Sequence, residues 1–413
     1  MNPTLIHVTQ RFPRPIVEDV SAVALAELSR VRKYFEGRSS IAIAVGSRGI
    51  ANLAQIVRQS VRVLSSWGCS PFIVPAMGSH GGATAQGQAE LLASYGITEE
   101  SMGCPVRSSM EVVEIPTSLG FGVYMDALAN AADGVLIINR IKPHTDFHGR
   151  YESGLVKMAV IGLGKERQAH QIHCYGTHGL RDLVPQAAHE ILSRGKIVAG
   201  LAIVENAYDE TAIIEAIPAQ EIEGREPELL AVAKGNMPRL PVEDLDVLIV
   251  DELGKNISGT GMDTNIIGRI RIPTEREPES PRIRAIMVDS LTPESHGNAT
   301  GMGLADVVTE RLRAAIDWEA TYTNIVTSGF ADRGKLPVVR RTAREAYEFA
   351  VRTCGMVAPE KLRVVRIKNT LHLGECWVSA SVAQELSARE EVLIGGEHPL
   401  FDDAGQLALA ARG

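Results

Sequence analysis

Residues 40–49, SIAIAVGSRG, carry the pattern on which the fold prediction depends. Ser40–Val45 is a short, continuously apolar run that ends in a polar, glycine-rich turn. The same arrangement recurs where Phe72–Met77 runs into GSHGG (78–82), and where Gly134–Asn139 runs into RIKPH (140–144). Helical patterns at about 52–66 and 85–94 separate these runs. Continuous apolar strands that alternate with helices are typical of a mainly parallel sheet covered on both faces.

The later part of the chain repeats this alternation. Further strands are expected at 197–204 and 247–251, and a charged, proline-rich loop follows at 275–282. After the loop we expect a strand at 283–288, helices near 304–316 and 342–353, and a strand near 362–367. The pattern predicts an α/β protein with two α/β domains, residues 1–255 and 256–413. We place the boundary near Gly254–Gly261 and expect that the C-terminal tail can pack back on the first domain.

Composition narrows the functional class. A chain of 413 residues is long enough for two or three domains, and its 45% hydrophobic and 22% charged residues are ordinary for a globular protein. The formal net charge of −8 disfavours nonspecific binding to nucleic acid or to an anionic membrane. No apolar run approaches the ~18 residues of a membrane span, and the N-terminus does not resemble a secretory signal. The 5 cysteines form no CxxC motif, which fits a cytoplasmic protein.

Three chemically active side chains follow predicted strands. Arg48 comes after the first strand, His80 after the second and His144 after the third. Ligands of parallel α/β sheets bind beyond the carboxyl ends of the strands, so these residues are candidates for one site. Arginine suits a carboxylate or phosphate, whereas histidine titrates near neutral pH.

Residues 143–173, PHTDFHGRYESGLVKMAVIGLGKERQAHQIH, form the densest functional pattern. Four of the 11 histidines fall here, and Lys157 lies among apolar neighbours, where burial would make an amine nucleophilic. His144 and His148 have a metal-ligand spacing if the segment is helical, but Pro143 and Gly149 oppose a helix. GLGK (162–165) resembles a phosphate loop without being a Walker A motif. Lys255, after the strand at 247–251, is a candidate for binding a substrate anion.

Together these segments resemble the nickel-dependent lactate racemase family. Members have two α/β domains, and the cleft between them holds a nickel-pincer nucleotide tethered to a lysine. SGLVK (153–157) is similar to the family's SGGRK, GSH (78–80) to its G-T-H, and Pro143-His144 to the Pro-His that precedes the lysine. The chain differs from the family at Val45, Gly81 and Val156, where the family has aspartate, arginine and arginine.

The resemblance implies a role for each matched residue. Lys157 would carry the cofactor, with Ser153 and Gly154 beside it, and His173, sixteen residues later, would bind nickel. His80 and His144 would be the paired acid and base groups. His148 competes with His144, because about three extra residues separate His144 from Lys157. Arg48 and Lys255 would bind substrate, and His170 and Lys165 are further candidates near the cofactor.

The implied function is a racemase or epimerase of 2-hydroxy acids. No amino-acid side chain accepts a hydride, so inversion through a keto acid requires a cofactor, two proton-transferring groups and cations for the carboxylate. Its partners would be a small hydroxy acid and the cofactor-synthesis proteins, and protein made without that pathway would lack the cofactor. A hydrolase or lyase with an ordinary divalent metal is one alternative. A non-enzymatic nucleotide- or metal-binding module is another.

Overall fold

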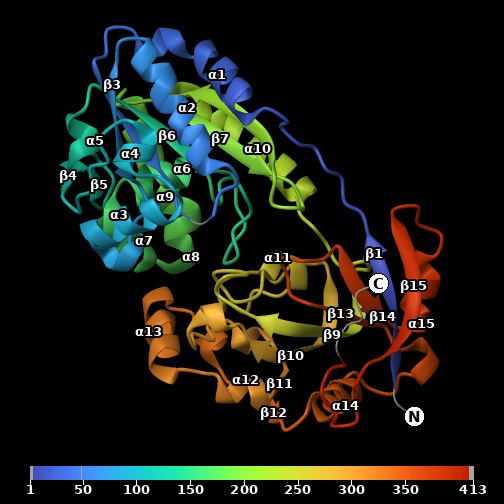
Figure 1. The fold of residues 1–413 in the computed structure, drawn as a ribbon. Coiled ribbons are helices and arrows are strands. Elements are labelled where there is room, and N and C mark those ends of the chain that lie inside the picture. Colours follow the sequence, from blue (N-terminus) through green and yellow to red (C-terminus); the bar gives the residue numbers. More distant parts are fainter. Residues whose placement is uncertain (1–2, 48, 409–413) are drawn as a thin grey trace. The chain divides into compact units, whose positions relative to one another are not determined.

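The computed structural model describes residues 3–47 and 49–408, which divide into two compact units. One unit is Pro13–Met237. The other joins the N-terminal segment through Phe12 to the chain from Pro238 onward (Figure 1). The units are divided between Met237 and Pro238, whereas we expected the boundary at 255/256. The difference arises because the strand Asp244–Leu253 pairs with strands of the second unit. The N-terminal strand thus belongs to the same unit as the later part of the chain.

The sheet of the Pro13–Met237 unit has the strand order β3-β2-β6-β7-β8. Strands β2, β3, β6 and β7 are parallel, and β8 runs antiparallel to β7. Apart from these, β4 and β5 form an antiparallel hairpin. The bounds are β2 Ser40–Val45, β3 Ser70–Pro75, β4 Val112–Ile115, β5 Val123–Asp126, β6 Gly134–Arg140, β7 Ile197–Glu205 and β8 Thr211–Pro218.

Helices cover both faces of this sheet, as continuous apolar strands require. Alternate residues of β2 point into different cores: Ile41 and Ile43 into one, Ala42 and Ala44 into the other. The first core takes side chains from α1 (Val20–Arg30), α2 (Leu53–Ser66), α3 (Ala85–Ser94) and α4 (Glu99–Met102). The second takes them from α5 (Ala127–Ala131), α6 (Leu155–Lys157), α7 (Lys165–His173), α9 (Val184–Ser193) and α10 (Ile222–Asn236). Figure 1 shows α1 and α2 side by side.

The second unit contains a mixed sheet of strand order β12-β11-β10-β9-β13-β14-β1-β15. Strands β9 to β13 are mutually parallel where they pair, and β14, β1 and β15 continue the sheet antiparallel. Helix α14 packs against the parallel part. The bounds are β1 Thr4–Gln10, β9 Asp244–Leu253, β10 Arg282–Leu291, β11 Val307–Thr309, β12 Val338–Arg340, α14 Ala343–Thr353, β13 Val364–Ile367, β14 Glu375–Val378 and β15 Val392–Pro399.

The predicted fold class is confirmed: both units are α/β with mainly parallel pairing. One predicted helix, 304–316, is wrong in its first half. The β-branched run Val307–Thr309 pairs with β10 as a strand, and a short helix, α12 (Glu310–Ala314), follows it. Among the described residues no helix is both long and apolar enough to cross a membrane.

Candidate active site

Three strand ends of the Pro13–Met237 unit meet at one edge of its sheet. Strand β2 lies between β3 and β6, and all three run parallel. Ser47 follows β2, His80 follows β3 and His144 follows β6. Adjacent strands are about 4.8 Å apart, so the loops that carry these residues are neighbours. Arg48, the predicted substrate-binding residue of the first loop, lies outside the described residues.

Ser47 fixes the ring of His80. The Oγ atom of Ser47 lies 2.5 Å from Nδ1 of His80, and both side chains are half-buried. The His80 turn rests on the start of α3, where Gln88 donates hydrogen bonds from Nε2 to the carbonyl oxygens of Gly78 (2.8 Å) and His80 (3.3 Å). Gly81 has φ +65°, and a Cβ there would lie 2.6 Å from the backbone nitrogen of Gln88. The glycine therefore lets the turn pack against this helix.

His144 and Lys157 touch across the next loop. Nε2 of His144 lies 2.7 Å from Nζ of Lys157. The loop returns on itself because Lys142 and Ser153 exchange two backbone hydrogen bonds, of 2.9 and 3.1 Å. Asn139, near the end of β6, donates from Nδ2 to the carbonyl oxygen of Gly154 at 2.9 Å. These contacts hold the start of α6, and with it Lys157, beside the carboxyl end of β6.

Buried Glu152 organises the inside of the same loop. Its side chain is 0% exposed, and its carboxylate accepts hydrogen bonds from the backbone N–H groups of His144 (2.7 Å) and Gly149 (3.3 Å). Lys234 Nζ lies 2.6 Å from Oε1, and His148 Nδ1 lies 3.4 Å from the same oxygen. Burial would raise the pKa of Glu152, but its bonds to His148, Lys234 and the His144 backbone hold the pKa below the usual value.

A second buried carboxylate, Glu226, lies at the start of α6. Its Oε2 accepts the backbone N–H of Val156 at 2.9 Å, and burial raises its pKa to about 7 against the lowering effect of the Val156 and Leu155 N–H groups. A Cβ on Gly154 would lie 2.4 Å from Oε1 of Glu226, so the residue before the helix must be glycine for the carboxyl to fit. This explains the Ser153-Gly154 pair as local structure. Ser153 pairs with Lys142 through its backbone, and Gly154 makes room for Glu226.

Lys165 is enclosed rather than placed in a phosphate loop. Its side chain is 0% exposed, and Nζ lies 3.0 Å from Asp126 Oδ2. The same ammonium donates to the carbonyl oxygen of Pro75 at 2.5 Å and to Gln88 Oε1 at 3.2 Å. Burial lowers the pKa of Lys165, against the opposing effect of Asp126. Lys165 therefore joins the end of β3, the start of α3 and the start of α7.

His173 ends α7 and is exposed, as is His170. Ala169, one turn before His173 on the same helix face, packs against the His80 turn, where a Cβ on Gly78 would lie 3.5 Å from Ala169 Cβ. His170 Nε2 lies 3.8 Å from the thiol sulfur of exposed Cys174. Within residues 3–47 and 49–408, no three His, Cys, Asp or Glu side chains gather in a way that could hold a metal ion.

Lys255 belongs to the other unit, where it follows β9. Its Nζ donates to the carbonyl oxygen of Gly259 at 2.5 Å and to Asn324 Oδ1 at 2.8 Å. Its backbone N–H donates to Ser295 Oγ at 2.9 Å. Lys255 therefore lies among polar side chains at the carboxyl edge of the β9–β10 pair, the kind of position at which α/β sheets bind ligands.

Comparison with solved structures supports a remote relationship. The lactate racemase apoprotein from Thermoanaerobacterium thermosaccharolyticum matches with a TM-score of 0.50 and 12% sequence identity, over 94% of this chain and 96% of that one. The two chains share a fold. At this identity the match does not extend to activity. No family model and no curated protein matches the sequence.

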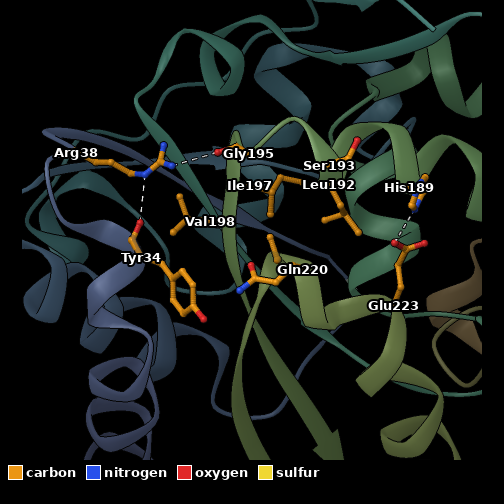
Figure 2. A pocket seen from close by; sticks show the side chains of 11 residues that line it. Tyr34, Arg38, His189, Leu192, Ser193, Gly195, Ile197, Val198, Gln220 and Glu223 are labelled. Atoms are coloured by element: carbon orange, nitrogen blue, oxygen red, sulfur yellow. Dashed lines mark hydrogen bonds and ion pairs between the residues drawn. The ribbon is translucent and has the colours of Figure 1, made fainter.

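A pocket of about 350 Å³ lies at the opposite edge of the same sheet, where β7 begins (Figure 2). The charged side chains that line it, with His189, already bond to other groups of the protein. Arg38 donates to the carbonyl oxygens of Tyr34 (3.2 Å) and Gly195 (3.3 Å), and His189 lies 3.0 Å from Glu223. His80 and His144 therefore lie away from this pocket, at the carboxyl edge of the sheet.

Ser47, Glu152 and Glu226 are site residues that the sequence did not indicate. Ser47 stands in the quoted turn, and its place two residues after a buried strand is a usable signal. The sequence does not mark Glu152 or Glu226 as buried, because a single glutamate in a polar stretch is usually a solvent-exposed side chain. Their burial becomes visible when the loop and α10 are assembled around α6.

Proposed function

We propose that the protein is a racemase or epimerase of a 2-hydroxy acid that works by hydride removal and return, with a nickel-pincer nucleotide tethered to Lys157. The observation that carries this proposal is the 2.7 Å contact between Lys157 Nζ and His144 Nε2. An amine for attachment and an imidazole for proton transfer lie together, at the sheet edge that also bears His80. The shared fold of a lactate racemase apoprotein supports the same assignment.

The residues around Lys157 fit such a group. Lys157 is half-buried beside the carboxyl end of β6, and the start of its helix is fixed by Asn139 and Glu226. His173 offers an exposed imidazole on the helix that packs against the His80 turn. We assign nickel binding to His173. When bound, the cofactor supplies the hydride acceptor that protein side chains lack.

The two histidines move the hydroxyl proton. As the α-hydrogen leaves with its electron pair, the hydroxyl must lose its proton and the carbon becomes the planar carbon of a 2-keto acid. Return of the hydride to the other face requires a proton donor on that side, so the two enantiomers need two bases. His144 and His80 take these roles. With Nδ1 of His80 held by Ser47, proton exchange with a substrate falls to Nε2.

His144 is the better candidate than His148 for the second base. The His148 side chain is 40% exposed and pairs with Glu152, whereas the His144 side chain is 12% exposed and contacts Lys157. Arg48 and Lys255 remain our candidates for binding the substrate carboxylate. We further propose that the protein works in the cytoplasm and receives its cofactor from the proteins that synthesise it.

The test is to produce the chain together with the cofactor-synthesis proteins and to measure intact mass, nickel content and turnover. A mass increase localised to the Lys157 peptide is expected, with exchange of the α-hydrogen in at least one chiral 2-hydroxy acid. Lys157→Arg should abolish the mass increase, and the matched loop variant Lys142→Arg should keep it. An unmodified Lys157 in protein produced together with the cofactor-synthesis proteins would contradict the proposal. An ordinary divalent metal with hydrolytic turnover would favour the hydrolase alternative, and cofactor binding without turnover would favour a carrier.

A further inference from the structure

Three residues of helix α10 contact the His144 loop or the helix that follows it. Near the first turns of α10, Glu226 caps the start of α6 through the backbone N–H of Val156 at 2.9 Å. Two turns further along, Lys234 reaches Glu152, with Nζ 2.6 Å from Oε1. Between the N-terminal end of this helix and the loop, the hydroxyl of Tyr151 donates to the carbonyl oxygen of Glu223 at 2.7 Å. The loop that carries His144 is therefore held from the side of α10.

Both carboxylate oxygens of Glu152 accept hydrogen bonds that hold the His144 loop in place. Oε2 accepts the backbone N–H of His144 at 2.7 Å, whereas Oε1 faces the N–H of Gly149 (3.3 Å), Lys234 and His148. A carboxylate accepts on both oxygens, but an amide in its place presents an NH₂ group to one set of these donors. The position of the His144 backbone thus depends on an ionised group at residue 152.

The ion pair with Lys234 makes an ionised Glu152 tolerable at this depth. The Glu152 side chain is 0% exposed, and an isolated carboxylate there would be costly. Charge-assisted hydrogen bonds from an ammonium and two backbone N–H groups offset that cost. The lowered pKa of Glu152 agrees with this geometry.

We propose that Glu152, held ionised by Lys234, is the positioning residue that keeps His144 against Lys157. It acts through the backbone of His144 and does not itself transfer a proton. The catalytic consequence rests on the proposed function, because His144 is there assigned as a base. Small errors in the placement of a catalytic group cost up to about 10²-fold in rate, so a loosened loop lowers kcat more than it weakens substrate binding.

The experiment compares three variants with a matched control on the same helix. Glu152→Gln removes the charge, Lys234→Met removes the partner and Lys234→Arg keeps it. Arg225→Met is the control, since Arg225 also lies on α10, is 40% exposed against 42% for Lys234, and pairs with Glu215 and Glu228 instead of the loop. If the buried Glu152→Gln change prevents folding, the exposed Lys234→Met variant still decides the question.

Two readouts are needed. In cofactor-free protein, hydrogen exchange of the peptide that contains His144 should become at least tenfold faster in Glu152→Gln and Lys234→Met, and stay unchanged in Arg225→Met. In cofactor-loaded protein, kcat should fall at least tenfold in the first two variants with KM within twofold of the wild type. Lys234→Arg should restore both values.

Some outcomes would overturn the positioning role. Exchange and kcat within twofold of wild type in both Glu152→Gln and Lys234→Met would do so. Equal losses in Arg225→Met would do so as well, since general loosening of α10 would then explain them. If no form of the protein, wild type included, turns over a hydroxy acid, the proposed function fails. The exchange measurement on cofactor-free protein still decides whether Glu152 positions His144.

Discussion

The Nε2 atom of His144 lies 2.7 Å from the Nζ atom of Lys157. The two residues are brought together because the backbone of Lys142 pairs with that of Ser153, which closes the loop between them. A group attached to Lys157 would therefore begin beside an imidazole. This contact also separates the roles of the two histidines in the loop, since His148 pairs with Glu152 instead.

His144→Asn should lower kcat by about 10²- to 10⁴-fold, the usual contribution of a general acid or base. His148→Asn should stay within about threefold of the wild type, because that exposed ring contributes one contact to a carboxylate that has other donors. Steady-state turnover of the cofactor-loaded variants, with the Lys157 mass increase as a loading control, measures both. The reverse ranking of the two variants would move the base to His148.

Much of this site's frame could be predicted from the sequence, because strand ends carry a local signal. Ser40–Val45 was predicted to the residue, and the strands before His80 and His144 were found within two residues at each end. Because the carboxyl ends of parallel strands lie at the same edge of a sheet, both histidines were then expected at that edge. The contact between His144 and Lys157 could not be predicted. It depends on backbone pairing between Lys142 and Ser153, which no repeating pattern in the sequence indicates.

Long-range pairing explains what the sequence did not indicate in the fold. Strand β1 pairs with β14 and β15, whose residues lie more than 350 positions later in the chain. The partners Ile6 and Val378, for example, are not joined by a hairpin turn, because the whole Pro13–Met237 unit lies between them in the sequence. Local patterns identify strands but not their partners over such distances, so the N-terminal segment could not be assigned to the later unit.

Ser47→Ala should lower kcat roughly two- to tenfold. One hydrogen bond contributes about 0.5–1.5 kcal/mol net, and each 1.36 kcal/mol of barrier is tenfold in rate. The physical reason is that the Ser47 hydroxyl, 2.5 Å from Nδ1, fixes the ring orientation of His80. Ser66→Ala is the control, since its hydroxyl bonds to the carbonyl oxygen of Val63 within α2. Equal kcat values for the two variants would show that Ser47 does not orient His80.

His173→Ala should lose nickel while the mass increase at Lys157 remains, because attachment and metal binding involve different residues. His170→Ala, a change on the same exposed turn of α7, should keep both. Metal analysis and intact mass of the co-produced proteins measure the two properties independently. Unchanged nickel occupancy in His173→Ala, or its loss in His170→Ala, would contradict the assignment of the ligand.

Lys165→Met should destabilise the protein by about 3–5 kcal/mol, because it leaves the buried Asp126 carboxylate without its cation. The double variant Lys165→Met with Asp126→Asn should recover part of this loss, since the uncompensated charge is gone. Denaturant unfolding of the wild type, both single variants and the double variant gives the coupling energy. Additive losses in the cycle would show that the two side chains do not depend on each other.

Glu226 should make stability depend on pH below neutrality. Its pKa is raised from 4.5 to about 7 by burial, so between these values the folded state binds more protons than the unfolded state. The contribution of Glu226 to stability is then fully present below about pH 4.5, falls as the pH rises toward about 7, and levels off above it, with a loss of about 3 kcal/mol in total. Glutamine at position 226 cannot titrate. As the pH rises from about 4.5 to about 7, the variant should therefore gain about 3 kcal/mol of unfolding free energy relative to the wild type. Chemical unfolding of both proteins at about pH 5, 6, 7 and 8 measures this difference. A pH-independent difference would mean that Glu226 does not hold a proton in the folded state near neutral pH.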